Sequence, residues 1–327
     1  IKSLKANILP KSFFTVEDEE LLETHLFNHK LPNPIGLAAG FDKSAEVYNS
    51  LFKFGFGFIE VGTVTPKRQL GNPKPRIFRL EKDQALINRL GFNNHGSEAI
   101  SKRISNDLPR GFLGINIGPN KETKNKEEDY YICLSKLFMH AGYITINISS
   151  PNTKGLRNFH DREEMEKLLI GLNKIKKNKK ITKPIGIKLS PDINDEDISI
   201  IVELVNKYGI QGIIVSNTTD KNRENLSDFK RSEPGGLSGK PLKDISTNLI
   251  KKFYKETKGR IKIIGVGGVD SGQSAFEKIT AGANAVQLYT GMVYKGPGIV
   301  KNIKKELISI LKKEKLKNTS EAIGINA

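Results

Sequence analysis

The sequence has very little cysteine, because Cys133 is the only one in 327 residues. An internal disulfide bond and a cysteine-based zinc site are therefore excluded, and the composition suits a reducing compartment. Cys133 lies in the segment YYICLSKLF, which has the pattern of a helix. We expect it to be a buried apolar residue rather than a nucleophile.

Long apolar runs are also missing. No stretch of about 18 apolar residues occurs, so none of these residues is expected to span a bilayer. No GxGxxG fingerprint follows a predicted strand, which argues against an adenine dinucleotide as a ligand. The chain begins with Ile1 rather than Met, and we expect that an amino-terminal segment precedes it in the natural protein.

Acidic residues are in deficit. There are 36 Asp and Glu against 53 Lys and Arg, which gives a formal net charge of +17. Nucleic acid, an anionic membrane surface and anionic small ligands would each suit this charge. Much of the excess is lysine in residues 174–183 and 301–317, so a solvated lysine-rich face is the simplest explanation.

Short apolar runs predict buried parallel strands, with helical patterns between them. Asn194 and the acids after it predict a helix start, and Gly209 follows that helix. Eight strands alternating with helices predict one α/β domain, a (β/α)₈ TIM barrel, rather than an open doubly wound sheet of usually about five or six strands. The predicted strands cover residues 35–39, 58–64, 112–117, 143–149, 185–189, 212–216, 262–266 and 285–289.

The segments outside this alternation have patterns of their own. A capped helix start at Thr15 predicts that residues 1–24 form a small helical appendage, separate from the barrel domain of residues 25–327. Residues 25–34 are predicted to be an extended pair that closes the amino-terminal end of the barrel. Residues 76–90 are predicted to form a hairpin, and residues 220–241 a mobile loop over the active face.

In a TIM barrel the residues that follow the strands converge on one pocket. Here they include Lys43 and Lys188 and a ring of Asn, Ser and Thr side chains. No carboxylate pair, histidine or cysteine is among them, which excludes glycosidase chemistry and a histidine-based zinc site, and no metal is predicted. Such fixed donors fit an anionic, amide-rich, planar cofactor.

The strand end in YITINISSPNTKGL, residues 143–156, carries Asn147, Ser150 and Asn152. Two amides can hold a planar ligand by its edges, and a hydroxyl can transfer a proton. Ser149 is expected to point away from the ligand, because side chains alternate along a strand. A Ser/Asn/Pro turn without chemistry is the alternative.

The last two predicted strands are followed by GVGG, residues 265–268, and YTG, residues 289–291. TIM barrels bind phosphate at this position, and glycine lets the backbone approach the phosphate closely. A tight turn without a ligand is the alternative. FMN would satisfy both the phosphate position and the planar ring, with Lys188 near the N1–C2 edge of the ring to stabilise its reduced form.

A series of motifs resembles the dihydroorotate dehydrogenase family, in the family's order and over nearly the whole barrel. The resemblance implies oxidation of dihydroorotate to orotate with FMN, in pyrimidine biosynthesis. The motifs are AAGFDK (38–43), GTVTP (62–66), NRLGFNN (88–94), NISSPNTKGLR (147–157), SNTT (216–219), GGLSGKPL (235–242), GVGGVDSG (265–272) and LYTG (288–291).

The resemblance also implies the class. The soluble class has a cysteine base where this chain has Ser150, whereas serine marks the membrane-associated class, which passes electrons to a quinone. Residues 1–24 resemble the end of that class's amino-terminal extension, whose amphipathic helices lie in the bilayer surface. The implied location is peripheral, on the cytoplasmic face of a bacterial inner membrane, or on the mitochondrial inner membrane in a eukaryote.

By the same resemblance, Ser150 is the base, removing the C5 proton while hydride passes from C6 to flavin N5, with water and Thr63 as a proton route. Arg79 and Tyr289 would lie toward the quinone, and Pro119 and Ser190 depart from the family's usual residues. Implied flavin contacts are Ala39, Gly40, Lys43, Thr63, Asn116, Asn147, Lys188, Ser216, Gly239, Gly268, Tyr289 and Thr290. Implied substrate contacts are Lys43, Asn88, Arg89, Leu90, Gly91, Phe92, Asn147, Asn152, Asn217 and Thr218.

Three alternatives stay open at this point. One is a soluble-class enzyme that uses fumarate or NAD. Another is a flavin barrel that reduces uridine in transfer RNA, which the positive charge would suit; such enzymes usually carry a catalytic cysteine and a separate helical RNA domain, so no nucleic-acid partner is expected. The third is a barrel that binds FMN without turnover.

Overall fold

The computed structural model describes residues 16–153 and 155–327. Thr15, the predicted helix cap, lies outside these residues. Between residues 16 and 23 the described chain contains a single 3₁₀ turn, η2 (Glu20–Leu22), in place of the predicted α-helix. Asp18 instead accepts a hydrogen bond from Asn33 Nδ2 at 2.7 Å and pairs with Lys304 Nζ at 2.7 Å, so this segment is bound to the barrel as an extended strap.

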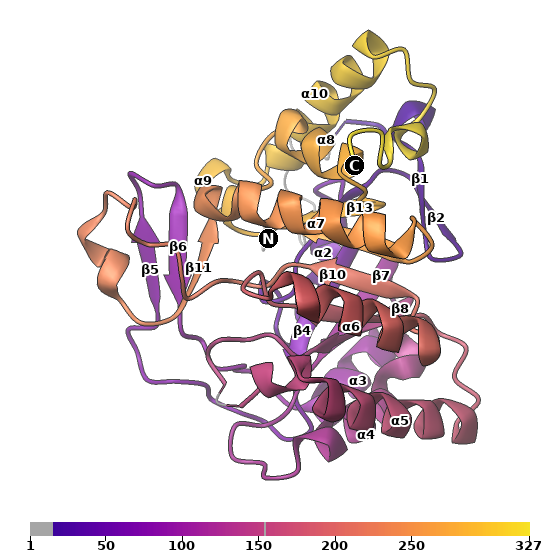
Figure 1. Ribbon diagram of the computed structural model, residues 1–327, viewed down its shortest axis with the longest axis vertical. Helices are drawn as coiled ribbons and strands as arrows, with labels where there is room; N and C mark the ends of the chain where they lie inside the picture. Colours follow the sequence, from indigo (N-terminus) through magenta and orange to yellow (C-terminus); the bar gives the residue numbers. More distant parts are fainter. Residues whose placement is uncertain (1–15, 154) are drawn as a thin grey trace.

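In the described residues, eight parallel strands close into a barrel, as predicted (Figure 1). Each buried run became a strand because both of its faces are covered, by helices outside and by side chains within. Four strands end one or two residues before the predicted end, where the chain turns to line the barrel mouth. The strands are β3 (Ile35–Leu37), β4 (Phe58–Val64), β7 (Phe112–Ile117), β8 (Tyr143–Asn147), β9 (Ile185–Leu189), β10 (Gly212–Val215), β12 (Lys262–Val266) and β13 (Ala285–Leu288).

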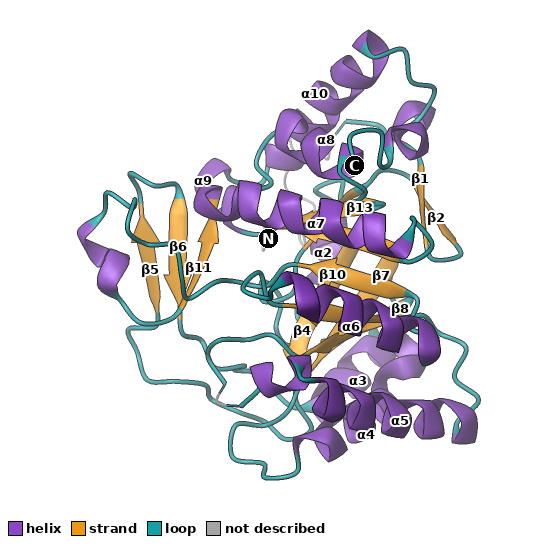
Figure 2. Cartoon of the chain, viewed as in Figure 1, coloured by secondary structure: helices purple, strands orange, loops and turns teal. Residues whose placement is uncertain are grey.

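Helices surround the barrel (Figure 2). The predicted cap at Asn194 is confirmed, because its Oδ1 accepts from the backbone N–H of Asp197 at 2.9 Å. In turn, Asp197 Oδ2 accepts from the backbone N–H of Asn194 at 3.0 Å. Cys133 is fully buried in α4, also as predicted, and burial raises the pKa of its thiol. The helices are α2 (Tyr48–Phe52), α3 (Ser97–Asn106), α4 (Lys126–Leu137), α5 (Arg162–Asn178), α6 (Asp195–Lys207), α7 (Lys243–Thr257), α8 (Gly272–Thr280), α9 (Thr290–Lys295) and α10 (Ile299–Lys313).

A small hairpin closes the amino-terminal end of the barrel, which confirms the predicted lid. Its strands β1 (Thr24–Leu26) and β2 (His29–Leu31) pair antiparallel. Between them Phe27 enters the barrel and its ring centroid lies 5.4 Å from that of Tyr143. This end of the barrel is therefore filled with apolar side chains, and the polar ends of the strands are at the opposite end.

A second, three-stranded antiparallel sheet stands beside the barrel mouth, on the left in Figure 1. Two of its strands, β5 (Ile77–Leu80) and β6 (Ala85–Asn88), form the predicted hairpin. The third, β11 (Gly236–Gly239), comes from the segment predicted to be a loop, and it pairs with β6. The loop prediction is wrong for these residues, because β6 offers a free edge that β11 covers.

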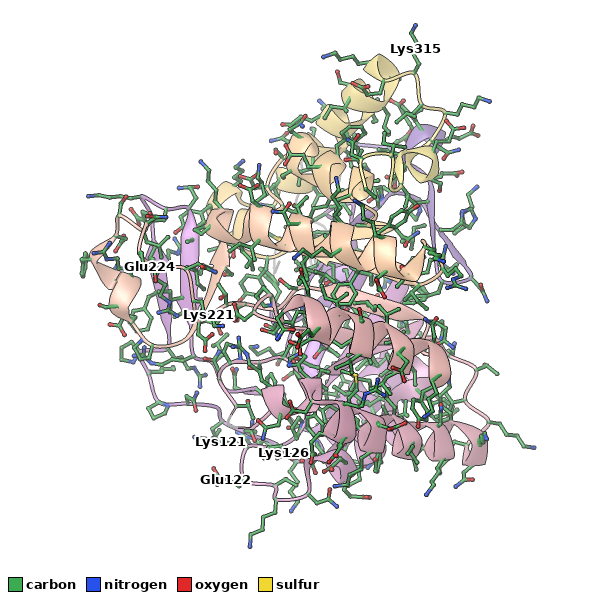
Figure 3. All side chains as sticks on the ribbon, in the orientation of Figure 1. Lys121, Glu122, Lys126, Lys221, Glu224 and Lys315 are labelled. Atoms are coloured by element: carbon green, nitrogen blue, oxygen red, sulfur yellow. The ribbon has the colours of Figure 1, made fainter. Side chains whose placement is uncertain are left out.

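Charged side chains gather on the outer surface (Figure 3), where for example Lys121, Glu122 and Lys315 are exposed. Opposite charges often meet there, as in the pair of Lys207 with Glu166 at 2.7 Å. Solvent screens such contacts, so they contribute little stability. Among the described helices, none is both long enough and apolar enough to cross a membrane.

Candidate functional site

A pocket lies at the carboxyl end of the barrel, where the strand ends meet the three-stranded sheet. Asn116 lies beneath the pocket rather than on its wall. Arg89 lines a neighbouring depression, where it pairs with Glu233 at 2.8 Å. The remaining predicted contacts line the pocket: Ala39, Gly40, Lys43, Thr63, Asn88, Leu90, Gly91, Phe92, Asn147, Ser150, Asn152, Lys188, Ser216, Asn217, Thr218, Gly239, Gly268, Tyr289 and Thr290.

The pocket wall also contains residues that the strand-end pattern did not reveal. Gln287 comes from the middle of β13, and its Oε1 is buried without a hydrogen-bond partner among the described residues. Ile77, Leu86 and Tyr294 add an apolar side next to the small sheet. Arg79, which the resemblance places toward the quinone, is not among the lining residues of the pocket.

Two lysines, the buried Lys188 and the half-buried Lys43, give the pocket its positive charge. Burial lowers the pKa of Lys43 to about 8, helped by the positive charges of Arg76 and Lys188. Burial also lowers the pKa of Lys188, while the negative charge of Glu60 opposes that change. Lys43 is therefore protonated below about pH 8, and the pocket can attract an anion at neutral pH.

The floor of the pocket is a chain of amide and hydroxyl groups. The Thr63 hydroxyl donates to Asn116 Oδ1 at 2.7 Å and accepts from Asn147 Nδ2 at 3.0 Å. Asn147 Oδ1 in turn accepts from Asn217 Nδ2 at 3.2 Å. Each amide is thus fixed in one orientation, which preorganises the donors and acceptors that face a ligand.

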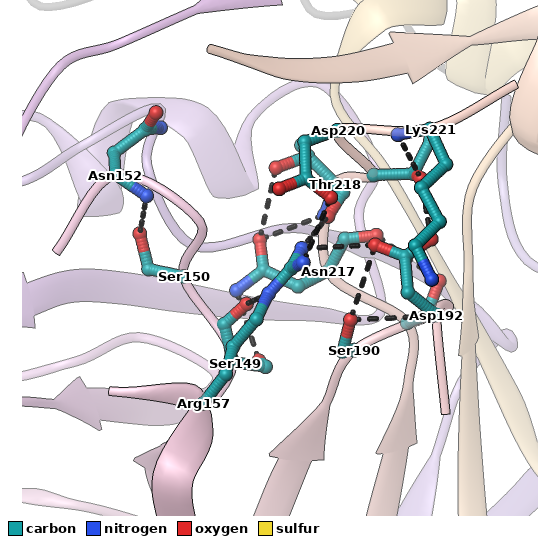
Figure 4. Close-up of polar contacts among 12 residues, drawn as sticks. Ser149, Ser150, Asn152, Arg157, Ser190, Asp192, Asn217, Thr218, Asp220 and Lys221 are labelled. Carbon is teal, nitrogen blue, oxygen red and sulfur yellow. Dashed lines mark hydrogen bonds and ion pairs between the residues drawn. The ribbon is translucent and has the colours of Figure 1, made fainter. Parts of the chain in front are cut away.

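The loop after β8 places Ser150 in the pocket, with only 6% of the residue exposed. Its Oγ accepts from the Asn152 backbone N–H at 3.3 Å (Figure 4), and Asn152 Nδ2 donates to Asn88 O at 3.0 Å. Ser149 is fully buried and lies outside the pocket lining; both serines follow the end of β8 at Asn147, so the loop rather than the alternation of a strand sets their directions. The Ser149 hydroxyl is nevertheless part of the site's support, because it accepts from Asn217 Nδ2 at 3.0 Å.

An ion-pair network that the sequence did not suggest ties three loops together (Figure 4). Arg157 pairs with Asp192 at 3.0 Å and with Asp220 at 2.8 Å, and it also donates to Thr218 O at 3.3 Å. Ser190, a departure from the family's usual residue, donates to Asp192 at 3.4 Å and supports this network rather than the pocket. The loops after β8, β9 and β10 are therefore held in one arrangement.

Glycines form a narrow cradle on the other side of the pocket. Gly268 has φ +70°, and a Cβ there would lie 2.5 Å from the Cβ of Lys243. Gly239 has φ +100°, and its Cβ would lie 2.4 Å from Gln84 O. Only glycine fits both the backbone angles and the space, so the backbone itself can approach a ligand closely here. A phosphate group suits such a site.

The fold and the site together define a TIM-barrel protein with a buried, cationic, amide-lined pocket and a glycine cradle, suited to a planar ligand that carries phosphate. The described residues contain no cluster of three or more His, Cys, Asp or Glu side chains that could hold a metal ion. Lysines, amides and hydroxyls are prominent among the polar groups that line the pocket.

Comparison with known proteins gives the family. The family model described as dihydroorotate dehydrogenase matches residues 21–311. A mouse protein named dihydroorotate dehydrogenase (quinone), mitochondrial, is 42% identical over 100% of this chain and 85% of its own length. A protein of Christiangramia forsetii named dihydroorotate dehydrogenase (quinone) is 47% identical over 91% of this chain and 87% of its own length.

A crystal structure of DHODH from Eimeria tenella in complex with ferulenol superposes with a TM-score of 0.93 at 39% identity, covering 99% of this chain and 93% of that one. The chain belongs to the dihydroorotate dehydrogenase family. Its barrel fold agrees with this membership, and the alternative of a transfer-RNA-modifying barrel is set aside.

Proposed function

We propose that this protein oxidises dihydroorotate to orotate and passes the electrons to a quinone, as a step of pyrimidine biosynthesis. The observation that carries the proposal is the convergence of Ser150 with the amides of Asn88, Asn147, Asn152 and Asn217 in one buried pocket. The resemblance of the motif around Ser150 implies that serine at this position marks the quinone-dependent class. The mouse and C. forsetii relatives carry the word quinone in their names.

FMN is the cofactor that fits these residues. Gly239 and Gly268 line the pocket without a side chain, so backbone can come close to a phosphate there. Lys188 supplies a buried positive charge, and Gln287 Oε1 is an acceptor without a protein partner among the described residues. When bound, FMN would accept a hydride from the substrate and later be reoxidised by the quinone. Ala39, Gly40, Lys43, Thr63, Asn116, Asn147, Ser216, Tyr289 and Thr290 complete the proposed set.

The substrate is held by amides and a cation. Four asparagines offer donors and acceptors to the planar ring, and their network fixes which end of each amide faces it. Lys43 is protonated below about pH 8 and would pair with the substrate carboxylate. The remaining proposed contacts are Arg89, Leu90, Gly91, Phe92 and Thr218.

Ser150 is proposed to take the C5 proton. A serine hydroxyl is a weak base, so the proton must leave Ser150 by a further route. The predicted relay through Thr63 would require that hydroxyl to turn away from Asn116 Oδ1, to which it donates at 2.7 Å. A route through water alone needs no such change, and we favour it.

The quinone is proposed to enter on the apolar side of the pocket, next to the small sheet. Ile77, Leu86 and Tyr294 line that side, and Ile77 is 50% exposed, so an apolar ligand could reach the pocket from the surface. We propose peripheral membrane association through an amino-terminal extension that precedes the strap of residues 16–23. A bacterial inner membrane or a mitochondrial inner membrane would supply the quinone.

The absorbance spectrum of the purified protein tests the cofactor and the substrate together. We expect a flavin band that bleaches when dihydroorotate is added without oxygen. Heating the protein should release the mononucleotide, which chromatography distinguishes from FAD. A spectrum without flavin from folded protein, or recovery of FAD, would contradict the proposal.

Steady-state assays with different oxidants test the class. We expect a short-chain quinone to support turnover and fumarate and NAD to be poor, because Ser150 stands where the soluble class has cysteine. The same preparation, with the same dihydroorotate concentration, serves as the control across acceptors. Faster turnover with fumarate would assign the protein to the soluble class.

A further inference from the structure

Glu60 is a fully buried carboxylate inside the barrel, on β4, outside the lining of the pocket. Its Oε1 accepts from Asn116 Nδ2 at 2.8 Å, and its Oε2 accepts from Tyr143 Oη at 2.8 Å, Thr145 Oγ1 at 3.1 Å and Gln287 Nε2 at 3.0 Å. Each of the two oxygens thus accepts from an amide nitrogen, and two hydroxyls complete the set around Glu60. Burial and the charge of Glu60 raise the pKa of Tyr143, so its hydroxyl remains a donor.

Glu60 sets the orientation of the amide side chains on the pocket floor. Because Glu60 can only accept, Asn116 must present its Nδ2 to it and its Oδ1 to the opposite side. There Asn116 Oδ1 accepts from Thr63 Oγ1 at 2.7 Å and from Asn147 Nδ2 at 3.3 Å. Asn147 must then direct its Oδ1 to Asn217 Nδ2, at 3.2 Å. Glu60 thereby determines which atoms of Asn147 and Asn217 face a ligand.

Glu60 also sets the orientation of the Gln287 side chain, which comes from β13. Its Nε2 donates to Glu60 at 3.0 Å and lies 3.3 Å from Tyr143 Oη. With the nitrogen fixed, Oε1 is left as a buried acceptor that has no partner in the described part of the chain, on a residue that lines the pocket. A buried unpaired acceptor at a pocket wall indicates a donor on a bound ligand.

Glu60 also supplies negative charge beneath a cationic pocket. Lys188 is buried beside that pocket, and the charge of Glu60 favours its protonated form. A buried charge acts over a longer range than an exposed one, because little solvent screens it. A flavin in the pocket would therefore experience the field of Glu60 together with that of Lys188.

We propose that Glu60 is a positioning residue of the flavin site, which orients the amides of the pocket floor and lowers the reduction potential of the bound flavin. The inference rests on the proposed function, because it concerns a flavin in this pocket. The carboxylate acts from below the pocket, through Asn116, Gln287 and its charge, without touching the pocket surface.

The test is the midpoint potential of FMN bound to Glu60→Gln, measured by spectroelectrochemistry at about pH 6, because burial lowers the pKa of Lys188 and a lower pH favours its protonated form. We expect a potential more positive than in the wild type, because a negative charge that opposes the reduced flavin is gone. Orotate should bind about tenfold more weakly, since one hydrogen bond of the amide chain is lost or reversed.

Thr145→Val is the matched control, because it removes one donor to Glu60 and leaves the charge and the pocket lining intact. Its flavin potential should match that of the wild type. An unchanged potential in Glu60→Gln with FMN bound would overturn the inference, and so would an equal shift in Thr145→Val. A wild type without flavin would instead contradict the proposed function itself.

Glu60→Asp keeps the test decisive if Glu60→Gln does not fold. Aspartate retains the charge but is one methylene too short to meet all four donors of Glu60. We expect a potential close to the wild-type value together with weaker orotate binding. A clear shift in potential with native orotate affinity would overturn the inference.

Discussion

Ser150→Ala is expected to leave FMN bound and to slow reduction of the flavin by dihydroorotate by ~10²- to 10⁴-fold, the usual contribution of a general base. Orotate affinity should stay nearly intact, because Asn88, Asn147, Asn152 and Asn217 hold the ligand. The loss should appear in the reductive half-reaction alone, since reoxidation by quinone involves no proton on Ser150. Stopped-flow absorbance of the flavin band, without oxygen, measures it.

Ser150→Cys should keep part of the activity and shift its pH dependence downward, because a thiol ionises near pH ~8.5, far below a serine hydroxyl. Ser149→Ala is the positional control, one residue earlier and outside the pocket lining. Since the Ser149 hydroxyl accepts from Asn217, this variant should weaken orotate binding modestly and leave the rate at saturating substrate unchanged. Equal slowing by both alanine variants would show that Ser150 is not the base.

Gly268→Ala is expected to purify without its cofactor and to bind added FMN about 100-fold more weakly, from strain and steric overlap together. The new Cβ would lie 2.5 Å from the Cβ and 2.7 Å from the Cα of Lys243, at φ +70°. Backbone and Cβ atoms at the start of α7 cannot rotate away, so the turn itself must move. Fluorescence titration of FMN onto the apo-protein measures the affinity, and circular dichroism confirms the fold.

The variant Gly296→Ala tests the effect of backbone strain on FMN binding without the steric overlap that Gly268→Ala introduces. Gly296 has φ +72°, close to that of Gly268, but a Cβ there meets nothing within 4 Å. With ψ −173° this backbone conformation is one that essentially only glycine adopts, so alanine there costs about 1–3 kcal/mol of strain without the clash, and FMN binding should be normal. Comparable loss of FMN from both variants would mean that Gly268 has no special part in the site.

The sequence was sufficient to predict the barrel and most of its pocket. Most of the predicted strands are short, near-continuous apolar runs such as Gly212–Val215, and burial on both faces leaves few other conformations for them. The residues after those runs converge because parallel strands point their carboxyl ends to one side. Position along the chain alone therefore placed Lys43, Ser150 and Asn217 in one pocket.

Features that depend on distant pairing could not be predicted in this way. The segment GLSG of β11 has little strand propensity, and it is a strand because β6 lies beside it; Gly236 and Asn88 are 148 residues apart. The network around Arg157 joins separate loops whose proximity only the closed barrel creates. For Glu60 the sequence did contain an indication, because an acidic residue in the middle of the buried strand FIEVGTV is unusual.

The pairing of β11 with β6 couples the two inserted segments, residues 65–96 and 216–242, to each other. Asn88 lies opposite Gly236, and a one-residue insertion or deletion in either strand would shift this register and turn alternate side chains to the other face. Asn88 would then leave the pocket, although neither insertion is part of the barrel. A change of length within one of these two strands should therefore be accompanied by a compensating change in the other.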